Sequence, residues 1–184
     1  MIFEETGLAG ALVIEPERIA DARGFFARTF CAREFAERGL AARFVQSSVS
    51  FNLRAGTLRG MHFQMPPHRE VKLVRCTAGA IWDAIVDLRT GSPTRLRWFG
   101  AELSAENRRM LYIPEGFAHG FLTLQPSSEV FYEMSEFYAP QAGRGLRWND
   151  PALAIAWPKA PQVIAERDAS YPDLDLGALA EIGS

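Results

Sequence analysis

The sequence predicts an all-β fold, an antiparallel sandwich or barrel of the jelly-roll kind. Two observations support this prediction: short apolar or alternating segments recur along the chain, and Gly- and Pro-containing turns separate them. Many short strands at regular spacing are typical of sandwiches and barrels. The chain has 184 residues, 48% of them hydrophobic, which is enough for one domain with a sizeable core. We therefore expect residues 1–184 to form a single jelly-roll domain.

The expected strands follow one another at short intervals from the N-terminus onward. They lie at 11–14, 15–19, 25–30, 44–52, 58–64, 70–74, 81–89, 97–103, 109–114, 115–124 and 129–138. Most of them are rich in β-branched, aromatic or alternating apolar residues, and most end at glycine, proline or a polar turn. The turn at 21–24 ends in Gly24, which can adopt a positive φ.

Two segments are expected to be short peripheral helices. Residues 31–39 form the best helical window, with Phe35 as an apolar anchor and Gly39 as a stop signal. Residues 176–182 are weakly helical. Between them, the chain after residue 148 is rich in proline and has no clear period. The sequence contains no internal repeat and no linker.

Charge and hydropathy exclude several classes of partner. Lysine and arginine total 20, and aspartate and glutamate total 22, so the formal charge is −2. This balance does not favour nucleic acid or an anionic membrane as a partner, although a local group of arginines can bind a small anion. No apolar run has the length of a membrane span, and the acids at 4–5 oppose a signal peptide. We expect a soluble, cytoplasmic protein.

The cysteines and histidines do not form a metal-binding motif. Cys31 and Cys76 lie in apolar surroundings without a nearby C-x-x-C motif, so we expect two free thiols. The histidines are His62, His68 and His119, and glutamine at position 64 interrupts a His-x-His pair on one strand face. We therefore expect no bound metal.

Strand alternation places several polar side chains on defined faces. In strand 58–64, Arg59 and Met61 should share one face, with His62 on the other. In strand 81–89, Asp83 should share a face with apolar residues, and a carboxylate buried there would need a partner. His62 could simply be a core or surface histidine, and Tyr132 a core aromatic residue. Polar residues at inward positions of a barrel more often line a ligand cavity.

Several motifs closely resemble the dTDP-4-dehydrorhamnose 3,5-epimerase family. They are DARGFF at 21–26, LRGMHFQ at 58–64, KLVR at 72–75, VDLR at 86–89, GSPT at 91–94, YIPEGFAHGF at 112–121, YAP at 138–140, NDP at 149–151 and ERD at 166–168. Together they are highly specific and cover residues 10–172. The resemblance implies a metal-free cupin jelly roll, without a cofactor, that forms a homodimer. Its implied substrate is a nucleotide-linked 4-keto-6-deoxyhexose, by default the dTDP form.

The resemblance also implies a role for each matching residue. Protons at C3 and C5 of the sugar are acidic because each carbon lies next to the C4 ketone. The implied catalytic set is His62 as general base, Asp168 as the carboxylate that orients it, Lys72 as the cation that stabilises the enolate, and Tyr132 as the acid on the opposite face. The implied substrate-binding set is Arg23 and Arg59 at the pyrophosphate, His119 at the sugar, Gln46 near the nucleotide, and Tyr138 and Arg167.

The chain departs from the family pattern at Arg28 and Gly143, where the family has glutamate, and at Ser48, where it has asparagine. Arginine cannot accept the hydrogen bonds of a carboxylate. The nucleotide base, the sugar, and inversion at C3, C5 or both therefore stay open. Two other interpretations also stay open: a metal-dependent cupin oxygenase or isomerase using His62 and His119, and a sugar-nucleotide-binding cupin without catalysis.

Overall fold

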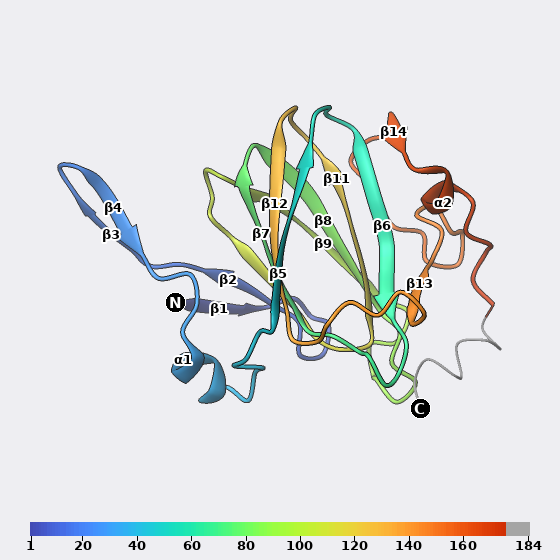
Figure 1. Ribbon diagram of the computed structural model, residues 1–184, viewed down its shortest axis with the longest axis horizontal. Helices are drawn as coiled ribbons and strands as arrows, with labels where there is room; N and C mark the ends of the chain where they lie inside the picture. The colour runs from blue at the N-terminus through green and yellow to red at the C-terminus, as the bar shows by residue number, and fades with distance from the viewer. Residues whose placement is uncertain (176–184) are drawn as a thin grey trace.

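A computed structural model describes residues 1–175, which form two large antiparallel sheets packed against each other (Figure 1). In strand order, the first sheet contains β1 (Ile2–Glu5), β2 (Leu12–Glu15), β10 (Met110–Ile113), β7 (Lys72–Ala78), β12 (Ser128–Met134) and β5 (Gln46–Asn52). The second contains β13 (Gly143–Gly145), β6 (Thr57–Gln64), β11 (Phe117–Thr123), β8 (Ala80–Asp87) and β9 (Trp98–Ser104). A short strand, β14 (Val163–Ile164), pairs in parallel with β6. The predicted antiparallel all-β fold is confirmed.

The remaining elements lie at the edges of this sandwich. β3 (Arg18–Asp21) and β4 (Gly24–Ala27) form a hairpin that projects away from the sheets (Figure 1). The helices are α1 (Ala32–Ala36) and α2 (Glu166–Ala169). Neither of these helices, the two within residues 1–175, has the length and apolar character needed to span a bilayer.

Most of the predicted elements form, with shorter bounds. The helix expected at 31–39 is α1, which ends before Gly39, a residue with φ of 69°. The strands expected at 25–30 and 129–138 stop at Ala27 and Met134. The sequence did not predict β1, β13, β14 or α2. The helix expected at 176–182 lies outside the described residues.

The main core fills the space between the sheets. It contains Val13, Val74, Leu111 and Val130 from the first sheet and Ile81, Ile85, Leu103 and Phe121 from the second, all nearly or fully buried. These residues come from alternate positions of their strands, as a period of two requires. Their burial removes large apolar surfaces from water and thereby stabilises the sandwich.

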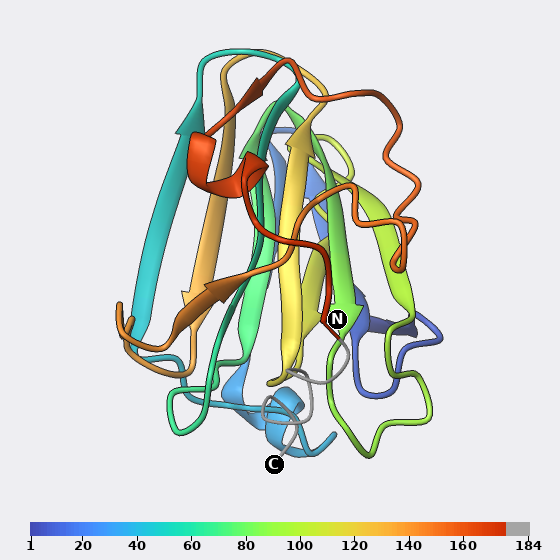
Figure 2. The ribbon, with the colours of Figure 1, turned by 90° about the vertical axis from the view of Figure 1, so that its right-hand side faces the viewer.

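The outer faces of both sheets are covered as well. Phe35 of α1 is fully buried against Leu73 and Tyr112, on the outer face of the first sheet. On the second sheet, Met61 and Val86 pack against Leu146 from the segment after β13. Figure 2 shows that the C-terminal part of the chain, which carries α2, crosses in front of β6. This segment closes one side of the space between the sheets.

Candidate active site

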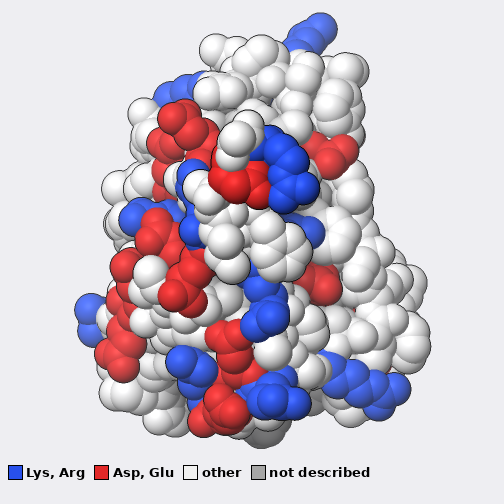
Figure 3. Space-filling model, turned by 90° about the vertical axis from the view of Figure 1, so that its left-hand side faces the viewer, with Lys and Arg blue, Asp and Glu red and all other residues white. Residues whose placement is uncertain are grey.

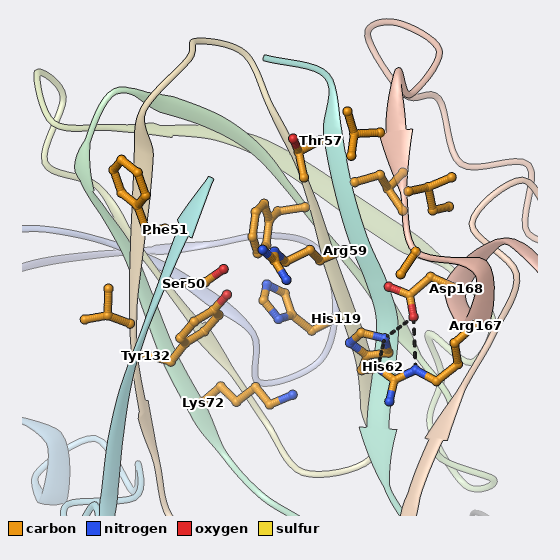
Figure 4. Close-up of a pocket in the computed structure, with 16 residues that line it drawn as sticks. Ser50, Phe51, Thr57, Arg59, His62, Lys72, His119, Tyr132, Arg167 and Asp168 are labelled. Atoms are coloured by element: carbon orange, nitrogen blue, oxygen red, sulfur yellow. Dashed lines mark hydrogen bonds and ion pairs between the residues drawn. The ribbon is translucent and has the colours of Figure 1, made fainter. Parts of the chain in front are cut away.

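Two adjoining cavities lie between the sheets. The larger has a volume of about 700 Å³ and the smaller a volume of about 560 Å³. Four side chains line both cavities, and they are His62, Lys72, Tyr132 and Arg167. Figure 4 shows side chains of β6, β7, β11, β12 and α2 converging on the larger cavity. The structure thus brings residues from distant parts of the chain to one place.

His62 of β6 is paired with Asp168 of α2. The imidazole Nε2 lies 2.8 Å from one carboxylate oxygen of Asp168, and the backbone N–H of Gly60 donates to the other at 3.0 Å (Figure 4). Burial by itself raises the pKa of Asp168, but the hydrogen bonds from His62 and Gly60 outweigh it, and the pKa lies below the ordinary value. Asp168 is therefore an ionised acceptor at neutral pH.

This pairing fixes the tautomer of His62. An ionised carboxylate only accepts hydrogen bonds, so Nε2 carries the proton that is donated to Asp168. The other ring nitrogen, Nδ1, then has a free lone pair and can accept a proton. A guanidinium nitrogen of Arg167 lies 3.2 Å from Nε2 and its Nε donates to Asp168 at 3.4 Å. Both groups are donors, so Arg167 shares the carboxylate with His62.

Asp168 reaches His62 because β14 guides the chain along β6. Val163 and Ile164 pair with Thr57 and Leu58 of β6, and α2 follows directly. The turn of α2 then places Asp168 beside Gly60, two residues before His62. A parallel pair of two residues in a proline-rich segment leaves no periodic pattern. The residues alone could not predict this contact, and only the family resemblance indicated it.

The predicted alternation along β6 is wrong at its centre. Arg59 and His62 both line the larger cavity, whereas strict alternation from Arg59 puts His62 on the opposite face. The cause is a β-bulge: Arg59 pairs with Phe121 and His62 pairs with His119, so β6 uses one residue more than β11 over this stretch. The extra residue turns His62 toward the cavity, while Met61 packs with Val86 and Leu146 on the outer face of the second sheet.

Arg59 is directed into the cavity by Asn52. The Nε of Arg59 donates to the side-chain oxygen of Asn52 at 2.8 Å, and Asn52 is buried at the end of β5. The terminal guanidinium nitrogens remain directed toward the cavity, where Figure 4 shows them near His119. A guanidinium held in this way is well suited to bind a phosphate oxygen.

Lys72 and Tyr132 occupy neighbouring strands on the other side of the cavity. Figure 4 shows Tyr132 of β12 facing the cavity from the side opposite His62, with Lys72 of β7 pointing toward His62. Burial raises the pKa of the Tyr132 hydroxyl well above its usual range. The hydroxyl therefore stays protonated and can act as a donor. The ammonium of Lys72 lies 3.0 Å from a carboxylate oxygen of Glu70.

His119 forms a second histidine–carboxylate pair. Its Nε2 lies 2.6 Å from Asp83 of β8, and both side chains are almost completely buried. The prediction that a buried Asp83 needs a partner is confirmed. His119 lines the larger cavity, and its ring meets that of Tyr132 edge to face, with centroids 6.2 Å apart. The cavity thus contains two imidazoles, each held by a buried carboxylate.

The smaller cavity contains two more of the predicted substrate-binding residues. Gln46 and Tyr138 line it, and the backbone N–H of Tyr138 donates to the Gln46 side chain at 2.9 Å. Tyr138 is an exposed side chain at the rim. Two positions that depart from the family pattern, Ser48 and Gly143, line the same cavity. Two of the three departures therefore line the smaller cavity and not the larger one.

Arg23 does not lie with the other predicted site residues of its own chain. It sits at the tip of the β3–β4 hairpin, 90% exposed, where it pairs with Asp21. Arg23 lines neither cavity, and the hairpin that carries it projects away from the sheets (Figure 1). Its predicted substrate-binding role stays a prediction. Arg28, just after the hairpin, pairs with Glu34 at 3.3 Å and also lies outside them.

Several lining residues were not predicted from the sequence. They are Ser50, Thr57, Phe121 and the segment 163–165 in the larger cavity, and Glu70 and Tyr171 in the smaller one. Alternation on β5 could have indicated Ser50, whereas the segment at 163–165 has no period. Residues 1–175 contain no group of three or more histidine, cysteine or acidic side chains that could hold a metal ion.

Comparison with known proteins assigns this all-β sandwich and its cavity to a class, the sugar epimerases of the cupin fold. Residues 5–175 match the family model described as dTDP-4-dehydrorhamnose 3,5-epimerase. The dTDP-4-dehydrorhamnose 3,5-epimerase of Salmonella typhimurium is 42% identical over 98% of this chain and 100% of that protein. The chain belongs to the dTDP-4-dehydrorhamnose 3,5-epimerase family, and the predicted family and fold are confirmed.

Two solved structures extend the comparison. The dTDP-4-dehydrorhamnose 3,5-epimerase of Bacillus anthracis, with TDP and PPi bound, has a TM-score of 0.90 and 42% identity and covers 94% of this chain and 99% of that one. A 3'-monoepimerase of Streptomyces bikiniensis in complex with dTDP-quinovose has a TM-score of 0.86 and 31% identity. It covers 97% of this chain and 88% of that one. The similar structures therefore include epimerases of two positional specificities.

Proposed function

We propose that this protein is an epimerase of a nucleotide-linked 4-keto-6-deoxyhexose, by default the dTDP form, in deoxysugar biosynthesis of the rhamnose type. The observation that supports this most directly is the His62–Asp168 pair, which leaves a basic ring nitrogen free opposite the protonated hydroxyl of Tyr132. A base and an acid on opposite sides of one cavity are what inversion of a carbon centre requires. The mechanism needs no cofactor.

In the proposed first step, His62 removes a proton from a carbon next to the C4 ketone. Asp168 orients the ring and stabilises the imidazolium that forms, because its carboxylate is already ionised and hydrogen-bonded. The electron pair of the broken C–H bond moves into the C–C bond, and the ketone oxygen becomes an enolate. A positioned base of this kind contributes on the order of 10²–10⁴-fold to the rate.

The enolate oxygen needs positive charge close to it. Lys72 lines both cavities, as His62 and Tyr132 do, and can supply that charge. Tyr132 then donates its proton to the same carbon from the face opposite His62, and the enolate returns to the ketone. The centre is inverted, with His62 left protonated and Tyr132 deprotonated until solvent resets both groups.

The nucleotide part of the substrate is proposed to use the cationic and polar side chains around this centre. Arg59 is presented for a phosphate by Asn52, and Arg167 lies at the junction of the two cavities. His119 is placed to contact the sugar, and Gln46 and Tyr138 to contact the nucleotide from the smaller cavity. The changes at Ser48 and Gly143 fall in that smaller cavity. The nucleotide base is therefore the part of the substrate that we expect to differ most from the family's usual substrate.

Solvent exchange, read together with the configuration of the product, tests this proposal and shows which positions react. Incubated in D₂O with 4-keto-6-deoxyglucose linked to dTDP, UDP, CDP or GDP, the protein should introduce deuterium at C3, C5 or both, read by mass spectrometry and NMR. Deuterium and inverted configuration at both carbons indicate a 3,5-epimerase, and inversion at one carbon indicates a monoepimerase. Absence of exchange with every nucleotide, together with ligand binding, would identify a binding protein without catalysis and reject the proposal.

We further propose that the protein works as a homodimer in which the β3–β4 hairpin reaches a second copy. Ile19 and Phe26 on the hairpin are 70% and 67% exposed, which is unusual for large apolar side chains. Figure 3 shows acidic and basic groups interspersed on the side of the molecule that bears the hairpin, without a field of one sign that would repel a copy. A crossing hairpin would bring Arg23 to the partner's cavity. Cytoplasmic location and organisation as one domain stay predictions.

A further inference from the structure

Glu70 contacts a residue of the proposed catalytic centre, and the mechanism above does not use it. Its carboxylate lies 3.0 Å from the ammonium of Lys72, and the two side chains are only 11% and 15% exposed. Exposed ion pairs contribute little because water and salt screen them. A largely buried pair is screened much less, and its loss leaves an uncompensated charge. The contact therefore matters for where the ammonium lies.

The backbone around Val71 forces Glu70 and Lys72 to the same side. The backbone N–H of Val71 donates to the Ser135 hydroxyl at 2.8 Å, and the Ser135 N–H donates to the Val71 carbonyl at 3.0 Å. The side chain of Val71 packs with Leu73 on the outer face of the first sheet. Because side chains alternate along an extended chain, the two neighbours of Val71 point to the cavity side.

The loop that carries Glu70 is held at its other end by Gln64. The amide nitrogen of Gln64 donates to the backbone carbonyls of His68 and Phe137, and its oxygen accepts from the N–H of Ala139. Gln64 is itself buried at the end of β6. The carboxylate of Glu70 is therefore presented from a fixed segment rather than from a free loop.

A lysine needs such a partner to act at a fixed point. Its side chain has several rotatable bonds and loses rotamer entropy when it is held in one position. Electrostatic stabilisation is effective only when the charge is in place before the reaction, since otherwise the group must reorganise during the step. Glu70 accepts one N–H of the ammonium and leaves two for a ligand in the cavity.

We propose that Glu70 is a positioning residue for Lys72, holding the ammonium at the junction of the two cavities where the enolate oxygen forms. The proposal rests on the proposed epimerase function. Glu70 lines only the smaller cavity, whereas Lys72 lines both, so Glu70 acts through the lysine and not on the sugar. The junction is also lined by His62, Tyr132 and Arg167, none of which supplies a carboxylate to the lysine.

The first test separates positioning from binding. Glu70→Gln should lower kcat about tenfold, because a misplaced group loses catalysis out of proportion to binding, with KM within about twofold of the wild-type value. Glu70→Asp, which keeps the charge, should recover part of the loss. Glu102→Gln, an exposed carboxylate on β9, is the control and should match the wild type. A raised KM with unchanged kcat would mean that Glu70 binds substrate directly.

A double-mutant cycle tests whether Glu70 acts through the lysine. In a Lys72→Met background, Glu70→Gln should change kcat by less than about twofold, because the group that it positions is gone. An equal tenfold loss in both backgrounds would overturn the proposal. Thermal unfolding of each variant shows whether a loss of activity comes from a loss of fold.

A chemical measurement checks the pairing without any substrate. The chain has two lysines, Lys72 and Lys159, so acetylation by acetic anhydride can be followed at each by peptide mass spectrometry. In Glu70→Gln, Lys72 should react several-fold faster than in the wild type, and Lys159 at the same rate. Unchanged labelling of Lys72 would refute the pairing even if the wild type proved inactive, whereas faster labelling in an inactive protein would count against the epimerase function alone.

Discussion

The two histidines of the cavity have similar partners but different surroundings. Nε2 of each ring faces a carboxylate, Asp168 for His62 and Asp83 for His119. His62 has a side chain that is 33% exposed and opens on both cavities, whereas the His119 side chain is 6% exposed. A general base must reach the substrate and exchange its proton with solvent, and His62 meets both conditions. We therefore propose His62, and not His119, as the group that removes the proton.

The first prediction concerns the acid and the base as a pair. His62→Ala and Tyr132→Phe should each lower kcat by roughly 10²–10⁴-fold, because each removes one proton transfer, with little change in binding. Tyr132→Phe should still exchange a substrate proton with D₂O, since His62 is intact, while forming little inverted product. Single-turnover kinetics with isotope analysis measures both. A fully active His62→Ala variant would contradict the assignment of the base.

The second prediction follows from the lowered pKa of Asp168. A carboxylate with a depressed folded-state pKa stabilises the fold fully above its unfolded pKa, near 4, and this contribution is lost as the pH falls toward the folded value. Compared with Asp168→Asn, the wild type should lose free energy of unfolding below about pH 4 and keep a constant difference above about pH 5. Urea unfolding at several pH values measures this. A difference that already declines near pH 6 would mean that the pKa is raised instead.

Strand β6 shows best how one element builds the site. Its bulge turns Arg59 and His62 to the same cavity, its backbone at Gly60 binds Asp168, and its end at Gln64 fixes two loops. The bulge depends on close approach of backbones: a Cβ added at Gly60, where φ is 122°, would lie 2.5 Å from Cα of Gly120 and 2.8 Å from the carbonyl oxygen of His119. No side chain can be accommodated there.

The third prediction is therefore that Gly60→Ala damages both fold and activity. Both the positive φ and the backbone contacts oppose a Cβ, so the free energy of unfolding should fall by at least about 2 kcal/mol. The pairing of His62 with Asp168 should be disturbed as well, because Gly60 binds that carboxylate. Gly91→Ala is the control, since a Cβ there meets nothing within 4 Å. Equal stability of the two variants in chemical unfolding would contradict this view of the bulge.

At the level of elements, the sequence predicted what depends on local period and missed what depends on pairing. Alternation correctly placed Asp83 on an inward face with apolar residues, because β8 is regular there. It failed at His62, since a bulge is specified by β11 as much as by β6. It gave no sign of β14 or α2, which are formed by contact with β6 and not by their own composition.

At the level of the whole molecule, a single chain contains a nearly complete candidate site. The proposed catalytic residues and most of the predicted binding residues line its two cavities, and Arg23 alone of the predicted set lies outside them, on the hairpin. An arginine pointed into solvent beside exposed Phe26 fits a role in a second copy better than a role in its own chain. The proposed dimer would thus complete the site.

The fourth prediction tests the dimer by complementation. Arg23→Ala and His62→Ala should each be impaired, the first mainly in substrate binding. If Arg23 serves the partner's cavity, a mixture that has exchanged subunits should recover about a quarter of the wild-type activity, since half of the dimers are mixed and each has one intact site. Sedimentation analysis measures whether the protein forms a dimer. A mixture no more active than its components would exclude a contribution across the interface.

The two cavities meet at four shared side chains, His62, Lys72, Tyr132 and Arg167, and this arrangement has a consequence for inhibitor design. Small compounds that each fill one cavity would both end at these four groups, where a linker could join them. A linked compound would gain from the high effective concentration of its second half. Because Ser48 and Gly143 line only the smaller cavity, that half would supply selectivity over relatives, while the half in the larger cavity would supply affinity.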